Sequence, residues 1–178
     1  MKTIYFIAAL MFTIATPAFA AQQPANAVQS NALMSEAVEL EWQDLIPESE
    51  RSRFNELSAQ ALEHNGNAAS QSAIGDIRPE LAGSNIKIPG FVIPLEGDAE
   101  NITEFLLVPF YGACIHVPPP PPNQIIHVKF DKGAPTQDLW DIVYITGRLK
   151  AETLVTHELG VESGYSIDGA SLEIYNET

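Results

Sequence analysis

A thiol and an imidazole stand two residues apart near the middle of the chain, at Cys114 and His116. In an extended backbone alternate side chains point to the same face, so the two groups would be presented together. His127 lies on the next expected strand and is the natural third ligand. A thiolate and two imidazoles suit zinc or copper and leave a fourth position for water or a partner's side chain. The spacing therefore predicts an exposed metal site at Cys114, His116 and His127, suited to sensing or transfer.

Two other interpretations of these residues stay open. A free cysteine is often a small buried hydrophobe, and the two histidines would then be hydrogen-bonded strand residues. Alternatively, Cys114 serves a thiol-dependent oxidoreductase through mixed disulfides with partners. A nucleophilic cysteine needs a histidine that an acid orients, and no acid is obviously placed to do so. Cys114 is the only cysteine, so no intramolecular disulfide can form; the thiol could link two chains, and the oligomeric state stays open.

Five consecutive prolines follow the cysteine and histidine. They lack backbone N–H groups and fix φ, which imposes a stiff polyproline II rod of about 15 Å, at roughly 3.1 Å per residue. We expect this rod to cross one end of a β-sheet. Such segments also dock into aromatic grooves on partner proteins. We therefore assign partner docking to Pro118, Pro119, Pro120, Pro121, Pro122, Asn123 and Gln124.

The second half of the chain has the composition of a β-domain. Runs rich in Val, Ile, Phe and Tyr, bounded by Gly, Pro, Asp and Asn, cover residues 86–95, 104–111, 124–130, 140–150 and 170–175. Segment 140–150 alternates well, and Gly147 within it suits a bulge or bend. The pattern predicts a mainly β fold, a small five-stranded OB-like barrel. A small open sandwich fits nearly as well, because closure leaves no mark in a sequence.

One amphipathic helix is expected on the N-terminal side of the barrel. Apolar residues recur at helical spacings over about 49–64, and Asn65-Gly66 provides a C-terminal stop. Trp42 and Leu45 precede the helix, and we expect them to pack on the core. The helix therefore belongs to a segment that is anchored to the domain before the strands begin.

The first residues have the features of a secretory signal peptide. Lys2 supplies a positive charge, and the apolar run at residues 4–16 is shorter than the roughly 20 residues needed to cross a bilayer. We expect cleavage after Ala20 and a periplasmic protein without membrane insertion. The expected organisation is a signal peptide at 1–20, a flexible leader at 21–40, a Trp-containing segment and helix at 41–66, a linker at 67–85 and the barrel at 86–178.

The chain is strongly acidic. Nine Lys and Arg residues stand against 23 Asp and Glu residues, giving a formal net charge of −14. Such a charge disfavours binding to nucleic acid and to anionic lipid surfaces. We therefore expect no nucleic-acid partner.

Three segments, residues 42–47, 88–96 and above all 112–124, carry a resemblance to a known family. On these segments the chain resembles the bacterial family called domain of unknown function 3299 (DUF3299), over about residues 40–175. The resemblance implies exported or lipid-anchored proteins, often found beside ABC-type transporter components and in some cases in settings linked to zinc. The residue directly after Ala20 is Ala21, so the chain lacks the lipid-attachment cysteine that the anchored members carry at the cleavage point.

The leading hypothesis is a non-enzymatic periplasmic accessory protein of an ABC-type transport system. It would bind or sense a soft divalent metal, Zn²⁺ or copper, through Cys114, His116 and His127. A metal-free interaction module that docks through the proline segment is the alternative, and the thiol-dependent oxidoreductase is the third hypothesis.

Overall fold

The computed structural model describes residues 37–52, 71, 75–114, 119–135, 138 and 140–175. Across those ranges no helix is both long and apolar enough to span a bilayer. The expected signal peptide and most of the leader lie outside the described residues, as does the expected helix from residue 53 onward.

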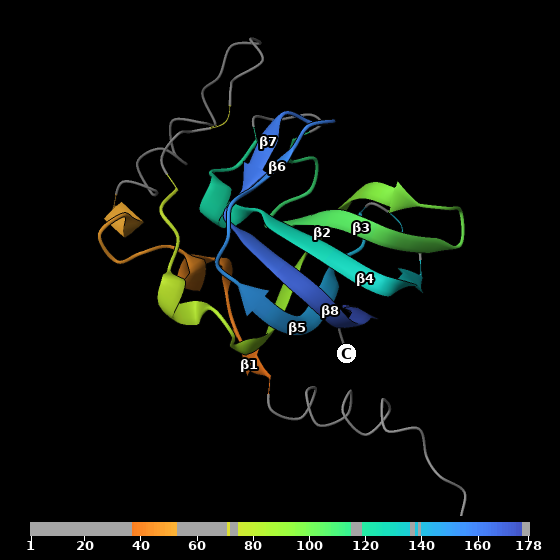
Figure 1. Ribbon diagram of the computed structural model, residues 1–178, viewed down its shortest axis with the longest axis horizontal. Coiled ribbons are helices and arrows are strands. Elements are labelled where there is room, and N and C mark those ends of the chain that lie inside the picture. Colours follow the sequence, from red (N-terminus) through yellow and green to blue (C-terminus); the bar gives the residue numbers. More distant parts are fainter. Residues whose placement is uncertain are drawn as a thin grey trace, which may run out of the picture.

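A closed β-barrel forms the centre of the protein (Figure 1). Its strands are β2 (Asn85–Gly97), β3 (Asn101–Val108), β4 (Ile126–Pro135), β5 (Val143–Lys150) and β8 (Tyr165–Ile174). They are hydrogen-bonded in the order β2-β3-β4-β8-β5, and β5 pairs again with β2. Only β4 and β8 run parallel among the barrel pairs. This closed, mainly β arrangement confirms the predicted OB-like barrel and excludes the open sandwich.

Two glycines mark the irregular positions of the barrel strands β2 and β5. β2 pairs with β5 over Asn85 to Gly90 and with β3 from Phe91 onward, so the strand changes partners at Gly90. A Cβ on Gly90 would lie 2.7 Å from Leu107 Cγ, which is too close for any side chain. On β5 the register with β8 shifts between Thr146 and Gly147, which confirms the predicted irregularity at Gly147.

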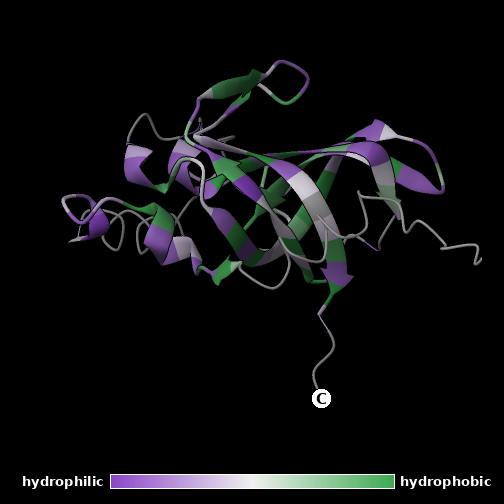
Figure 2. Ribbon diagram, turned by 60° about the horizontal axis from the view of Figure 1, so that its bottom comes forward, coloured by the Kyte–Doolittle hydropathy of each residue, from purple (hydrophilic) through white to green (hydrophobic). Residues whose placement is uncertain are grey.

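The barrel interior is filled by alternate residues of every strand. Fully buried members include Ile86, Ile88, Phe105, Leu107, Ile126, Val128, Val143, Ile145 and Tyr165. Figure 2 shows the corresponding alternation of hydrophobic and hydrophilic positions along the strands. Because each fully buried aliphatic or aromatic side chain contributes about 1.5–3 kcal/mol, this core supplies most of the folding free energy. No disulfide contributes, since Cys114 is free.

The N-terminal segment is anchored to the barrel, as expected for Trp42 and Leu45. It contributes the short strand β1 (Val38–Glu39), parallel to β2, and the 3-10 helix η1 (Trp42–Leu45). Leu45 is fully buried in the core, and the Trp42 indole N–H donates to the Pro89 carbonyl at 2.7 Å. The segment thereby covers the barrel beside β2.

The described part of the expected linker is Gln71 and residues 75–85, of which Asn85 already belongs to β2, and it is held by specific contacts. It forms the 3-10 helix η2 (Pro79–Leu81), and the Arg78 backbone N–H donates to the Tyr165 hydroxyl at 2.7 Å. The same hydroxyl donates to the Leu45 carbonyl at 2.8 Å. One buried tyrosine on β8 therefore joins two segments that lie before the barrel in sequence.

A small hairpin projects from the barrel between β5 and β8 (Figure 2). Its strands are β6 (Leu154–Thr156) and β7 (Val161–Ser163), joined by a four-residue turn. The sequence did not predict this hairpin, because strands of three residues are too short to show alternation.

Replacing Tyr165 with phenylalanine tests the anchoring role of its hydroxyl. The change leaves the Leu45 carbonyl and the Arg78 N–H without their partner, so we expect the free energy of unfolding to fall by about 1–3 kcal/mol. Urea denaturation of the purified protein measures this loss. Tyr111→Phe is the matched control, because the Tyr111 ring is half exposed. Equal losses in the two variants would contradict the assignment.

Candidate functional site

Cys114 lies in a turn just beyond β3, on the outside of the barrel. Its backbone adopts a φ of 63°, in the left-handed region that favours glycine, and nearby Gly112 has a φ of 77°. The side chain is half-buried and packs against a second hydrophobic cluster. We call this the outer cluster; its buried members are Ile93, Leu106, Val108, Ala113, Ile125 and Val161.

The surroundings of Cys114 are those of an inert thiol. Burial raises the pKa of the Cys114 thiol to about 11. At neutral pH the group is therefore protonated, and only the thiolate attacks disulfides or binds metals. A metal ligand or redox cysteine at this position would first need to lose its proton in an apolar setting.

His127 also faces the outside of the barrel. Its strand neighbours Ile126 and Val128 point into the core, and its register partner on β3 is Leu106 of the outer cluster. Cys114 packs on the cluster that contains Leu106. Both residues therefore border the outer cluster on the outside of the barrel, His127 across the strand pair from Leu106 and Cys114 in the turn beyond β3.

His127 has an acidic partner that the sequence did not reveal. The His127 Nε2 atom lies 2.7 Å from Glu104 Oε1, and Lys129 Nζ lies 3.4 Å from the other carboxylate oxygen. Desolvation by burial is the strongest influence on Glu104 and raises its pKa, but His127 and Lys129 together outweigh it. The pKa of Glu104 therefore lies below its ordinary value.

The third predicted ligand, His116, lies outside the described residues. Within the described ranges, no three His, Cys, Asp or Glu side chains are gathered as a metal site would require. The three-ligand site therefore stays a prediction.

The proline run is built into the protein at its C-terminal end. It continues into the 3-10 helix η3 (Pro122–Gln124), and the buried residues here are Pro120, Pro122, Asn123 and Gln124. The Pro122 carbonyl accepts the Gly164 N–H at 2.6 Å. The Pro120 carbonyl accepts the Gln71 side-chain N–H at 2.9 Å. Among the described prolines, Pro119 and Pro121 are only partly buried and keep some surface for a partner.

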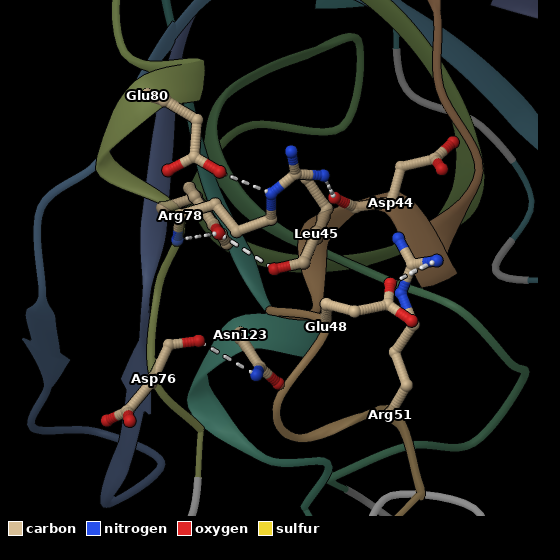
Figure 3. Close-up of polar contacts among 9 residues, drawn as sticks. Asp44, Leu45, Glu48, Arg51, Asp76, Arg78, Glu80 and Asn123 are labelled. Atoms are coloured by element: carbon tan, nitrogen blue, oxygen red, sulfur yellow. Dashed lines mark hydrogen bonds and ion pairs between the residues drawn. The ribbon is translucent and has the colours of Figure 1, made fainter.

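Asn123 and Gln124 serve the protein's own chain. The Gln124 side-chain N–H donates to the Trp42 carbonyl at 2.9 Å. The Asn123 side chain donates to the Asp76 carbonyl at 3.0 Å, as Figure 3 shows, and to Glu50 at 3.2 Å. These bonds connect the end of the proline run to the N-terminal segments.

A shallow recess of about 200 Å³ lies beside this junction. It is lined by Pro47, Glu48, Arg51, Ile77, Arg78 and Glu80. Figure 3 shows Arg78 turned toward Glu80 and Asp44, and Arg51 turned toward Glu48. Arg78 bonds Glu80 at 2.8 Å and the Asp44 carbonyl at 2.6 Å, and Arg51 pairs with Glu48 at 3.0 Å. The charges of the recess are balanced within it.

Comparisons with known proteins place the fold among solved structures. The family model described as "Protein of unknown function (DUF3299)" matches residues 42–174. The crystal structure of a DUF3299 family protein from Pseudomonas aeruginosa PAO1 is 38% identical, over 80% of this chain and 98% of that chain, with a TM-score of 0.64. Two OBody proteins, each solved bound to hen egg-white lysozyme, are more distant. The first is 20% identical over 64% of this chain, and the second is 18% identical over 65% of this chain. Each match covers 100% of the OBody chain with a TM-score of 0.34. A search of curated proteins gives no match.

Alkylation of Cys114 measures the state of its thiol. A rise in pKa from 9.0 to about 11 lowers the thiolate fraction at neutral pH about 100-fold. We therefore expect iodoacetamide to react with the folded protein about 100-fold more slowly than with the unfolded chain, and the rate to climb until about pH 11. Mass spectrometry across a pH series gives the rates. A plateau near neutral pH would reveal an activated thiol and contradict the assignment.

Proposed function

The chain belongs to the DUF3299 family, whose function is unknown, and on that premise we propose that it is a periplasmic binding module that docks a protein partner on the outer face of β3 and β4. OB-type barrels use the face of their second and third strands to bind ligands. In this chain β3 and β4 are the second and third barrel strands. The outer cluster and Cys114 lie on the same face.

The observation that carries the proposal is a pair of exposed aromatic side chains beside Cys114. Phe110 is 44% exposed and Tyr111 is 52% exposed, although both are large apolar groups. The Tyr111 ring meets the Phe91 ring edge-on, with 6.2 Å between ring centroids. Aromatic anchors of this kind dominate the energy of protein interfaces. We call Phe91, Phe110, Tyr111 and Cys114 the docking surface.

The charge and the thiol favour a protein partner over other classes. The net charge of −14 disfavours nucleic acid. A thiol with a pKa of about 11 is poorly suited to the oxidoreductase alternative. The resemblance noted above suggests the partner, a component of an ABC-type transporter. Export through the expected signal peptide, with cleavage after Ala20, would bring the module to that partner.

Site-specific photo-crosslinking tests the docking surface. We expect a photoreactive residue in place of Tyr111, in the full chain expressed in its native compartment, to capture one discrete transporter subunit. Mass spectrometry of the adduct identifies the captured protein.

The same photoreactive residue in place of Trp140 is the matched control. Trp140 is 65% exposed and is also aromatic, but it precedes β5 and lies outside the outer cluster. Equal capture from both positions, or no capture from Tyr111, would count against a partner on the docking surface.

Metal binding is a second candidate function, and the contact between His127 and Glu104 favours it. Histidine ligands of metals commonly bond a carboxylate through the ring nitrogen that does not bind the metal. Nε2 of His127 lies 2.7 Å from Glu104, which leaves Nδ1 as the ligand atom. Cys114 and His116 would complete the donor set, and thiolate and imidazole both suit zinc or copper.

Calorimetric titration with zinc and with copper tests this candidate. We expect binding to the unaltered protein, loss of binding in Cys114→Ser, and about 10- to 100-fold weaker binding in Glu104→Gln, because the acid orients the histidine. Binding that is the same in Cys114→Ser as in the unaltered protein would discard the site.

A further inference from the structure

In the described part of the chain, the β6–β7 hairpin is fastened through β7. Val161 of β7 is buried in the outer cluster, next to the docking surface. Glu162 of β7 is bonded by the side-chain amide of Gln71, which donates to the Glu162 carbonyl at 2.7 Å and accepts the Glu162 N–H at 2.8 Å. The Gln71 amide thus satisfies the outer edge of β7 in the way a third strand would. The same amide also donates to the Pro120 carbonyl, which ties this edge to the proline run.

This bonding shows in which direction the backbone N–H and C=O of Val155, on β6, must point. In an antiparallel pair, the N–H and C=O of one residue point to the same side. The backbone of Glu162 points to Gln71, so it points away from β6. Val155 is the register partner of Glu162, and its N–H and C=O therefore point away from β7. The outer edge of β6 presents one donor and one acceptor at Val155.

Among the described residues, nothing bonds the backbone N–H or C=O of Val155, so both groups are available to a binding partner. The matching edge of β7, in contrast, is bonded by Gln71. The Val155 side chain is also 50% exposed, although it is apolar and β-branched. An unpaired strand edge with an exposed apolar residue is a template for an added strand.

The carboxylates of the hairpin are unopposed by Lys or Arg within it. Residues 154–163 contain Glu158 and Glu162, no Lys or Arg, and one histidine, His157. Both glutamates are exposed. A strand that adds beside β6 would therefore be favoured if it carried positive side chains.

We propose that the outer edge of β6 accepts an extended, basic segment of the protein partner as a third strand of the hairpin. The inference rests on the proposed docking function and specifies the chemistry of the partner. The added segment bonds the N–H and C=O of Val155, and its Lys or Arg side chains lie near Glu158 and Glu162. Because Val161 joins the hairpin to the outer cluster, one partner can occupy this edge and the docking surface together.

Fluorescence anisotropy with a labelled Lys-Val-Lys-Val-Lys-Val peptide tests strand addition on the full chain. We expect Val155→Pro to bind the peptide about five- to tenfold more weakly, because proline removes the outward N–H. Val155→Thr is the matched control, because it keeps both the N–H and a β-branched side chain, and it should bind like the unaltered chain. A Glu-Val-Glu-Val-Glu-Val peptide should not bind.

A second variant avoids any change in the backbone. Glu158→Lys combined with Glu162→Lys should also weaken binding of the basic peptide, since the Gln71 bonds use only the backbone of Glu162. Equal binding by the proline and threonine variants, equal binding of the two peptides, or no binding at millimolar peptide would each overturn strand addition.

The two proposals fail separately. Capture from Tyr111 without peptide binding would overturn strand addition and leave the docking surface standing. If Val155→Pro weakens peptide binding but Tyr111 captures no partner, strand addition at the β6 edge is supported and the proposed docking surface is overturned.

Discussion

The pairing of β2 with two different strands is the constraint on which the structure depends. Its first half bonds β5 and its second half bonds β3, so this one strand closes the sheet. The change of partners falls at Gly90, where Leu107 of β3 occupies the space that a Cβ would need, so only glycine allows this close approach. Closure separates an interior face, filled by the main core, from an exterior face that carries the outer cluster. The candidate site exists because that exterior face is not needed to fill the barrel.

Much of the barrel could be predicted from local pattern alone. Each barrel strand overlaps a run rich in β-branched and aromatic residues, and Gly147 marks the shift in register that it was expected to mark. Trp42 and Leu45 were expected on the core and lie there. The hairpin escaped prediction because its strands, at three residues each, are stabilised by Val161 and by Gln71 rather than by their own periodicity.

The candidate site was less predictable, because its contacts cross between strands. Glu104 precedes His127 by 23 residues and meets it as a diagonal neighbour across β3 and β4, a relation that only the register creates. The proline run shows a different limit of sequence reasoning. Its missing donors indicated a stiff rod, but they gave no sign of where the proline carbonyls bond, and those of Pro120 and Pro122 accept from Gln71 and Gly164. The retained acceptors are what draw the end of the run into the protein.

The backbone of Cys114 adds a further consequence. A left-handed conformation costs a residue with a Cβ roughly 1–2 kcal/mol, a cost that glycine would not incur. The Cys114 side chain packs on the outer cluster, in which Val161 of the β6–β7 hairpin is buried. The burial of the thiol therefore depends on the hairpin staying in contact with the barrel, and exposure of the sulfur would report on the detachment of the hairpin.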